Sequence, residues 1–530
     1  MSTNKQTKGM GFADQLPAPD PMPGGSLNPR AAEYAKYREA FFDPKYDGFG
    51  PELEYVGELP FKPSKDVKNS ILGVGFELLD HRTGYIFEKV LPIAKDSGVK
   101  WARLQSGWQR AEKVPGVYDF GWLDEIVDGL REAGIQPWFS LSFGNGLYME
   151  GYDPVPPHGT YMYSPTAFGE KGINGWVNYC KAMATHFKDR VFHWEVWNEP
   201  NAGFLRKPTW RDMPVGKSRA ELPEEYVKLV KITEEAIHSV QPEGKIIAGS
   251  ISGCAICNEY IQRLFDAGIA NYIDCFSYHP YQGVPEPNYP QRLQFIRDLI
   301  AESGRNITIW QGENGRPSNS ATLGRGIKNT EGSQARYLCR RYLTDLRQQV
   351  EVSSYFLICD IGNGYLPNGN VHSQGVIDAT DPENYRPKLA FRAMQSFAYL
   401  FDSDTKPMTA CFEIQPLQPF AHSAVPLEAA SGITCGFRRG NVPIFAYYQP
   451  TNIDSGYQVK PIRIQTWVHP SMKFDKPVLI DPITAKVYQI KQMATWSDGN
   501  WGNVLVIPKL PLLDYPLFVT DASLLDELAK

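Results

Sequence analysis

The chain has 530 residues, of which 42% are hydrophobic and 21% charged, and this near-average composition argues against wholesale disorder. The length exceeds one ordinary domain, so we expect a large barrel with an accessory domain, or several small domains. The net charge of −5 supplies no broad positive field for a polyanion, and nucleic acid is therefore not an expected partner.

No apolar run is long enough to span a bilayer, and the first residues, MSTNKQTKGMGFADQ, lack the apolar core of a signal peptide. We expect a soluble, cytoplasmic protein without a membrane partner, or a secreted or periplasmic one if a signal was removed. Eight cysteines in so long a chain form no dense disulfide framework. Cys275, Cys359 and Cys435 lie in apolar segments typical of buried free thiols, which favours a reducing compartment.

The chain begins with a stretch rich in Pro and Gly. Residues 8–30 lack an apolar period, so we expect residues 1–30 to form an arm rather than a domain. Residues 31–68 follow as an N-terminal segment that packs on, or adds a strand to, a later domain, with Glu52 to Phe61 as the candidate strand.

From Ser70 to Phe401, short apolar runs alternate with longer segments of helical period, which is typical of βαβ units. The strand candidates are Ile71–Phe76, Val99–Gln105, Gln136–Ser142, Phe192–Trp197, Lys245–Gly249, Cys275–Tyr278, Ile307–Gln311 and Ser354–Ile358. The helix candidates include Trp122–Ala133, Gly175–Phe187, Glu224–Val240, Gln291–Ser303 and Ser333–Gln349. We predict an α/β fold with a (β/α)₈ TIM barrel over residues 69–401; a doubly wound open sheet is the structural alternative.

After Phe401 the pattern changes to short strands separated by turn residues. The candidates are Ile433–Phe437, Pro443–Tyr448, Ile462–Val468, Val478–Ile480, Val487–Ile490, Asn503–Ile507 and Leu517–Thr520. This predicts a β-sandwich accessory domain over residues 402–530. Such a domain could stabilise the barrel, form a homo-oligomer surface or bind glycans.

The stretch VFHWEVWNEPN, Val191 to Asn201, is an apolar strand that runs into Asn198, Glu199 and Pro200. Residues that end barrel strands face the mouth of the barrel, so Glu199 is expected to project into a catalytic pocket. Asn198 could hydrogen-bond a substrate hydroxyl. The surrounding rings could dehydrate the Glu199 carboxyl and raise its pKa, as a general acid requires.

A second apolar strand, NITIWQGENGRPS, ends near Glu313. Taken alone, either glutamate reads as a strand-end carboxylate that caps a helix or pairs with a base. Two carboxylates at the ends of different barrel strands are what glycosidic cleavage needs, because one protonates the leaving oxygen while the other attacks the anomeric carbon. The pair therefore favours catalysis, with Glu199 as general acid/base and Glu313 as nucleophile.

These motifs resemble clan A of the glycoside hydrolases, which carries its acid/base after an Asn at the end of strand four and its nucleophile at the end of strand seven. Counting strands places Glu199 on the fourth and Glu313 on the seventh. The stretch PGVYDFGWLDEIVDGLREAGIQPWFSL, Pro115 to Leu141, is similar to family 39 and its relatives. The resemblance covers about residues 70–400.

The resemblance implies further site residues. Arg103, in VKWARLQ, matches the clan's arginine that supports the nucleophile and would keep Glu313 ionised. His279 and Tyr281, in SYHPY, resemble the histidine and tyrosine that line the same subsite. The eighth strand departs from the clan, since SSYFLICD has no tryptophan to serve as a sugar platform and leaves Phe356 or nothing.

Other residues are weaker candidates for substrate binding. Rings at or after strand ends could stack on sugar or simply pack in the core: Trp108, Trp138, Tyr148 and Trp310. Acidic and basic groups after the first strand could bind substrate or a cation, or form a solvated cluster: Glu77, Asp80 and His81. Cys254 and Cys257 have the spacing of half a zinc site, but no second ligand pair accompanies them.

We therefore expect a retaining glycoside hydrolase that acts on β-linked oligosaccharides or polysaccharides by double displacement, without a metal or organic cofactor. Resemblance to family 39 suggests a β-xylosidase or another exo-acting enzyme. Transglycosylation and endo-glycanase activity would use the same site. Two alternatives of other classes are a catalytically inactive carbohydrate-binding barrel and a metal-dependent hydrolase.

Overall fold

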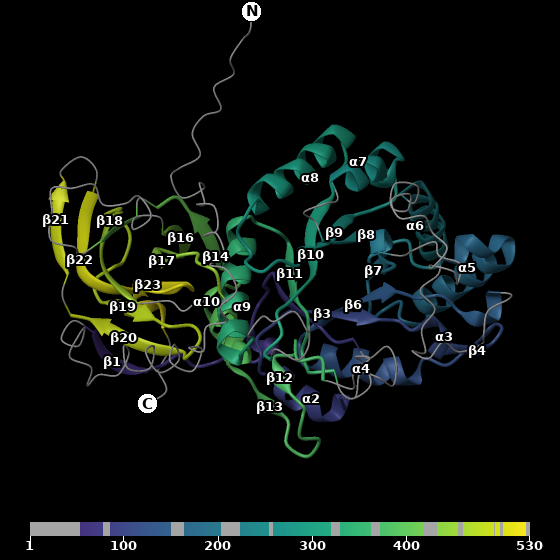
Figure 1. The fold of residues 1–530 in the computed structure, drawn as a ribbon, viewed down its shortest axis with the longest axis horizontal. Coiled ribbons are helices and arrows are strands. Elements are labelled where there is room, and N and C mark those ends of the chain that lie inside the picture. Colours follow the sequence, from purple (N-terminus) through teal and green to yellow (C-terminus); the bar gives the residue numbers. More distant parts are fainter. Residues whose placement is uncertain are drawn as a thin grey trace, which may run out of the picture.

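The structure is a computed structural model that describes residues 53–77, 85–149, 164–202, 223–253, 258–319, 329–361, 371–410, 412–416, 432–453, 459–491, 493–498 and 502–525. Figure 1 shows two bodies side by side, a barrel surrounded by helices and a group of antiparallel sheets, with α9 and α10 between them. Among the described residues, no helix has the length and hydropathy needed to cross a membrane.

Eight parallel strands close into a barrel in the order β10-β11-β2-β3-β6-β7-β8-β9. They are β2 (Leu72–Gly75), β3 (Trp101–Gln105), β6 (Gln136–Leu141), β7 (His193–Val196), β8 (Lys245–Ser252), β9 (Cys275–His279), β10 (Thr308–Asn314) and β11 (Val352–Tyr355). Each contains part of one predicted strand, and the predicted TIM barrel is confirmed. The eighth begins two residues earlier than expected, and the seventh extends to Asn314, so that Glu313 lies within it.

Each barrel strand is followed by a helix: α2 (Phe87–Ala94), α4 (Gly121–Glu132), α5 (Gly169–His186), α6 (Pro223–His238), α7 (Asn258–Asp266), α8 (Tyr289–Ser303), α9 (Glu331–Arg347) and α10 (Leu389–Leu400). A short helix, α3 (Trp108–Ala111), and a hairpin of β4 (Glu112–Val114) and β5 (Val117–Tyr118) follow β3. A second two-stranded ribbon, β12 (Ile377–Asp378) and β13 (Arg386–Pro387), precedes α10.

Two antiparallel sheets form the second body, in agreement with the predicted β-sandwich. One has seven strands: β1 (Leu53–Glu58), β20 (Lys486–Ile490), β19 (Pro477–Ile480), β23 (Leu517–Asp521), β17 (Val442–Tyr448), β16 (Ile433–Arg439) and β14 (Thr405–Met408). The other has four: β15 (Phe412–Pro416), β18 (Lys460–Val468), β22 (Gly502–Leu512) and β21 (Ala494–Asp498). The first strand comes from before the barrel, so the seven-stranded sheet is discontinuous in sequence.

Helix α10 joins the two bodies through its aromatic side chains. Phe397 and Phe401 lie edge-on against Phe518 of β23, with ring centroids 5.4 and 5.3 Å apart. Phe401 also contacts Phe437 of β16. Helix α10 is buried along most of its length because it serves the barrel and the seven-stranded sheet together. The two bodies therefore share an apolar interface.

Candidate active site

Glu199 is positioned by an irregular turn directly after β7. The backbone has a positive φ at Trp197 (67°) and at Glu199 (49°), a conformation that costs energy in residues with side chains. The turn is held because the amide of Glu199 donates to the carbonyl of Ser250 at 3.1 Å. Just beyond it, Asn201 and Ser252 exchange two hydrogen bonds, at 2.8 and 3.0 Å. The end of β8 therefore fixes the direction in which Glu199 points.

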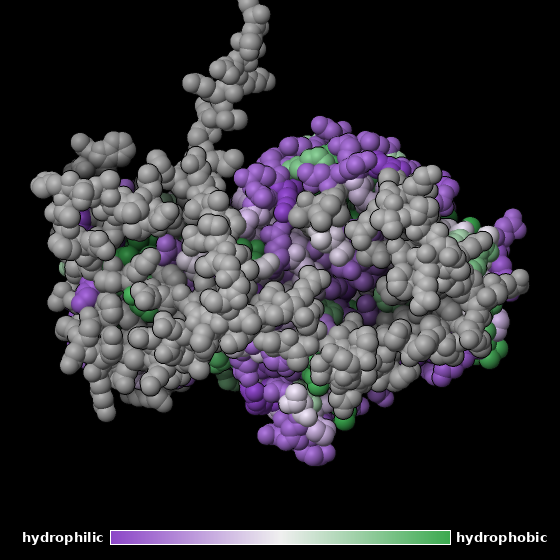
Figure 2. Space-filling model, viewed as in Figure 1, coloured by the Kyte–Doolittle hydropathy of each residue, from purple (hydrophilic) through white to green (hydrophobic). Residues whose placement is uncertain are grey.

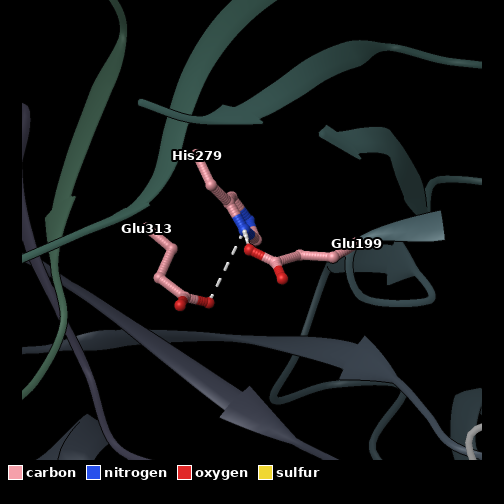
Figure 3. A group of neighbouring side chains, drawn as sticks. All are labelled: Glu199, His279 and Glu313. Carbon is pink, nitrogen blue, oxygen red and sulfur yellow. Dashed lines mark hydrogen bonds and ion pairs between the residues drawn. The ribbon is translucent and has the colours of Figure 1, made fainter. Parts of the chain in front are cut away.

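Glu313 lies on β10 and is held through both of its oxygens. Tyr281 donates to Oε1 at 2.7 Å, and Arg103 donates to Oε2 at 2.9 Å. His279, the last residue of β9, lies between the two glutamates, with its Nδ1 3.0 Å from Glu199 Oε1 and 3.7 Å from Glu313 Oε2. Figure 3 shows the three side chains converging, His279 from β9, Glu313 from β10 and Glu199 from the turn after β7.

The two carboxylates are close to each other and open to the solvent. A carboxylate oxygen of Glu199, one of Glu313 and a ring nitrogen of His279 all lie within 4.8 Å of one another. The side chain of Glu199 is 23% exposed and that of Glu313 13%, whereas His279 and Arg103 are fully buried. Of these four side chains, the two glutamates are the ones that an incoming molecule can touch. Figure 2 shows the described surface of the barrel half as mainly hydrophilic, including a hollow near its centre.

Arg103 organises the site from below. Its three nitrogens reach Glu195 Oε2 at 2.6 Å, Glu313 Oε2 at 2.9 Å and Asn198 Oδ1 at 2.8 Å. Burial lowers the pKa of the guanidinium, but the surrounding carboxylates outweigh it and raise the pKa above its ordinary value. Arg103 therefore remains a fixed cation that connects the nucleophile candidate with the turn carrying Glu199.

Glu195 was not among the residues predicted from the sequence. Its carboxylate is fully buried on β7 and also accepts a hydrogen bond from the Ser250 hydroxyl at 2.6 Å. Burial raises its pKa, yet Arg103 and these hydrogen bonds hold it below the ordinary value. A signal was present, because a charged residue inside the apolar strand HWEV requires a buried partner.

Glu77 is a third carboxyl group beside Arg103. It is 4% exposed, its Oε1 lies 3.5 Å from Arg103 Nη1, and neither oxygen has a hydrogen-bond partner among the described residues. Burial raises the pKa of Glu77 to about 8, against the attraction of Arg103. The group is therefore a neutral acid at neutral pH, at the edge of the same site.

The expectation that the pKa of Glu199 is raised is wrong for the ligand-free site. Burial does raise its pKa, but the hydrogen bond and the electrostatic attraction of His279, helped by Ser252 and Arg103, lower it below the ordinary value. The prediction rested on the aromatic rings near Glu199, whereas the polar groups that face its carboxyl determine the direction of the pKa shift. The carboxyl is therefore an anion in the ligand-free site.

Trp310 and Trp108 do not line the site, and their prediction as sugar-stacking residues is corrected. Trp310 is 4% exposed inside the barrel, with its ring 5.1 Å from Trp101 and 5.4 Å from Trp138. Trp108 is fully buried and stacked between Tyr148 and Tyr179. Both side chains pack in the core. Trp310 does so because it lies three residues before Glu313, towards the closed end of β10.

Several other candidates stay predictions. Asp80, His81, Cys254 and Cys257 lie outside the described residues. Phe356 follows β11 and is half-buried, edge-on to His372 at 5.8 Å.

Within the described part of the chain, one group of side chains could converge on a metal ion: Glu199, His279 and Glu313. The atoms that would bind an ion already face protein donors. Both oxygens of Glu313 accept hydrogen bonds from Arg103 and Tyr281, and Glu199 Oε1 faces the Nδ1 of His279. A positive guanidinium next to Glu313 repels a second cation, so the arrangement fits organic acid/base chemistry better than metal binding.

Over part of its length, the chain is similar to known glycoside hydrolases. Residues 100–294 match the family model of glycosyl hydrolases family 39. A beta-xylosidase of Geobacillus stearothermophilus is 29% identical over 210 residues, which are 35% of this chain and 38% of that protein. A beta-xylosidase of Caldicellulosiruptor saccharolyticus is 30% identical over 136 residues, 24% of each chain. The chain thus matches less than half the length of these curated relatives.

The fold is shared over a greater length. A family 39 glycoside hydrolase from Bacteroides cellulosilyticus WH2 superposes with a TM-score of 0.59 at 19% identity, over 87% of this chain and 83% of that one. A monomeric beta-xylosidase from Caulobacter crescentus CB15 gives 0.52 at 15% identity, over 88% and 98%. These structures confirm the barrel with its additional sheets. Part of the chain is thus similar to glycosyl hydrolases of family 39 and to beta-xylosidases, and the solved structures show that the fold is shared.

Proposed function

We propose that the protein is a retaining glycosidase that acts on β-linked sugars, with Glu313 as the nucleophile and Glu199 as the general acid/base. The observation that carries this proposal is the distance of at most 4.8 Å between carboxylate oxygens of the two residues. Retaining enzymes hold their carboxyl groups about 5–5.5 Å apart, whereas inverting enzymes need about 6.5–9.5 Å to admit a water molecule. The short separation of these oxygens supports the retaining arrangement.

The reaction proceeds in two displacements. A carboxylate oxygen of Glu313 bonds to the anomeric carbon as the bond to the leaving oxygen breaks, and Glu199 gives its proton to that oxygen. The glycosyl ester on Glu313 is then attacked by water, whose proton passes to Glu199, and the ester bond breaks. Two inversions at one carbon retain its configuration. A sugar hydroxyl in place of water gives transglycosylation.

The neighbouring residues have distinct supporting roles in this mechanism. Arg103 and Tyr281 hold one oxygen of Glu313 each, which orients the carboxylate for attack. Asn198 uses its Oδ1 to accept from Arg103, so its amide nitrogen is the end that can donate to a substrate hydroxyl.

Glu199 must be protonated before it can act as an acid. In the ligand-free site, His279 and the other polar groups keep its pKa low. A sugar that covers the 23% exposed side chain removes water from the carboxyl, and this desolvation raises the pKa. Glu199 Oε1 faces His279 Nδ1, so the proton that is given to the leaving oxygen lies on the other carboxyl oxygen of Glu199.

The substrate class is inferred from the names of the relatives and not from the geometry of the site. Two relatives are beta-xylosidases by name, so a β-xyloside is the first substrate to test, and exo action on short oligosaccharides is the matching mode. An endo-glycanase or a transglycosidase would use the same pair of glutamates.

The test is hydrolysis of a panel of activated aryl glycosides (β-xyloside, β-glucoside, β-galactoside and α-arabinofuranoside) by wild type, Glu313→Ala and Glu199→Ala, with added azide. We expect turnover of one glycoside, its loss in Glu313→Ala, and rescue by azide as a glycosyl azide of inverted configuration. Glu302→Ala, an exposed glutamate on α8, is the matched control and should keep full activity. Activity that survives Glu313→Ala would overturn the mechanism. Oligosaccharide binding without any turnover would favour a binding barrel.

A further inference from the structure

The connection between β9 and α8, residues 280–288, carries a contact to the nucleophile candidate and a contact to the second body. Near its start, Tyr281 donates to Glu313 Oε1 at 2.7 Å. Five residues later, Glu286 is 2% exposed and accepts a hydrogen bond from Tyr448 of the seven-stranded sheet. The segment therefore touches both regions within six residues.

Glu286 is bound from two elements at once. Arg340 of α9 donates to both of its oxygens, at 2.6 and 2.7 Å, as a bidentate pair. Tyr448, the last residue of β17, donates its hydroxyl to Glu286 Oε1 at 2.9 Å. Burial raises the pKa of Glu286, but Arg340 and Tyr448 outweigh it and keep the pKa below its ordinary value. Glu286 is thus a fixed anion between the barrel and the seven-stranded sheet.

The backbone of the connection is held as well. Arg341 of α9 donates to the carbonyls of Pro280 and Pro285, both at 3.4 Å, and Arg316 reaches the carbonyl of Gly283 at 3.3 Å. Arg340 also donates to the carbonyl of Thr451, which lies beyond β17, at 2.6 Å. The segment is therefore fixed from α9, from Arg316 in the segment after β10, and from the second body.

We infer that the seven-stranded sheet takes part in catalysis at a distance: Tyr448 is a positioning residue that, through Glu286, holds the 280–288 connection so that the Tyr281 hydroxyl stays on Glu313. This inference rests on the proposed function, because it gives Glu313 a reaction to perform. It assigns the sheet a role beyond stabilising the barrel. The polar contacts of Glu286 carry it, because they join the segment that bears Tyr281 to β17 of the seven-stranded sheet.

The kinetic test is a double-mutant cycle with Tyr448→Phe and Tyr281→Phe on the glycoside that the wild type hydrolyses. Tyr281→Phe removes a hydrogen bond to a charged group and should lower kcat about tenfold or more. Tyr448→Phe removes only a distant hydroxyl and should lower kcat about threefold to tenfold, with KM nearly unchanged. Because both act on the same contact, the double variant should be no slower than Tyr281→Phe alone.

A matched control separates positioning from stability. Thr520→Val removes a buried hydroxyl that donates to the Pro443 carbonyl at 2.7 Å within the same sheet. It should lower the unfolding midpoint while kcat stays at the wild-type value. A wild-type kcat in Tyr448→Phe, or losses that multiply in the double variant, would overturn the inference.

Hydrogen exchange keeps the inference testable if no glycoside is turned over. Amides of the non-proline residues within 280–288 should exchange faster in Tyr448→Phe than in wild type, and at the wild-type rate in Thr520→Val. Unchanged exchange in Tyr448→Phe would contradict the linkage itself. Faster exchange in a protein that hydrolyses nothing would place the failure in the proposed function instead.

Discussion

Within the barrel, β3, β7 and β10 each carry an aromatic ring near one end and a charged residue two or three positions later. Trp101, His193 and Trp310 pack together at the amino-terminal end, with Trp310 5.1 Å from each of the other two rings. Arg103, Glu195 and Glu313 follow on the same strands towards the mouth and are joined by ion pairs. Side chains of a barrel strand alternate between interior and exterior, so residues two apart form successive interior layers. On β10 the spacing is three residues, and the register of this strand shifts between Gln311 and Asn314.

The difference between these layers shows how a closed barrel supports a polar site. The aromatic layer excludes water from below, and in that environment the charges above it interact strongly with one another. Arg103 pairs with both carboxylates of the polar layer, and Ser250, Tyr281 and Asn198 supply its remaining hydrogen bonds. We therefore expect substitutions in the upper layer to affect reaction rates first, and substitutions in the lower layer to affect stability first.

The largest loss of kcat should come from Glu199→Ala, which changes a residue at the open end of the barrel, above both layers. Loss of a general acid lowers kcat about 10²- to 10⁴-fold for substrates with a poor leaving group, because the leaving oxygen then departs without a proton. Activated aryl leaving groups need less help and should lose far less. The measurement is kcat against leaving-group pKa; an equal loss for all leaving groups would contradict the role of Glu199.

Arg103→Met should affect both rate and stability, because Arg103 is the cation of the upper layer. Removing one partner of a buried ion pair costs about 3–5 kcal/mol in the free energy of unfolding. Denaturant unfolding and kcat/KM measure the two losses. Arg263→Met is the matched control on the surface, where the pair with Glu224 should be worth at most about 1 kcal/mol. Wild-type activity in Arg103→Met would break the proposed division between layers.

Trp310→Ala tests the lower layer. Replacing a buried tryptophan by alanine costs about 3–5 kcal/mol of stability through lost burial and a cavity. KM should remain near the wild-type value, since the ring lies in the barrel floor and not beside the sugar. Thermal unfolding and initial rates on the folded protein measure this. A raised KM with unchanged stability would show that Trp310 binds substrate and would contradict its role in packing.

The smallest effect concerns Glu77 and appears only at alkaline pH. Its pKa is raised to about 8, so Glu77 is neutral below that pH and gains a negative charge above it, beside Arg103 and Glu313. We expect kcat/KM of the wild type to fall as pH rises through about 8. Glu77→Gln keeps a neutral group of the same shape, so it should retain activity within a few-fold at neutral pH and lose this alkaline decline. An unchanged pH profile would contradict the assignment.

The sequence predicted the eight barrel strands and the meeting of Glu199 with Glu313, because apolar runs and strand-end carboxylates are local signals. The position of a side chain between the floor and the mouth of the barrel has no such local signal. Trp310 and Glu313 are three residues apart, yet Trp310 lies in the floor and Glu313 at the mouth. Glu195 was missed because its partner Arg103 is 92 residues away in the chain. Strand β14, with the sequence TKPM, contains a proline and a lysine and resembles a turn until its pairing with β16 is known.

Strand β1 is synthesised before the barrel, whereas its partner β20 is synthesised after it. Strand β1 pairs with β20, so that Leu53 lies opposite Ile490, and the seven-stranded sheet cannot close until most of the chain has left the ribosome. During that time β1 is an unpaired edge available for wrong partners. The barrel is complete in sequence before β20 exists, so it can fold first, and capture of β1 then becomes a late step. A fragment that begins after the barrel would lack this strand and expose β20.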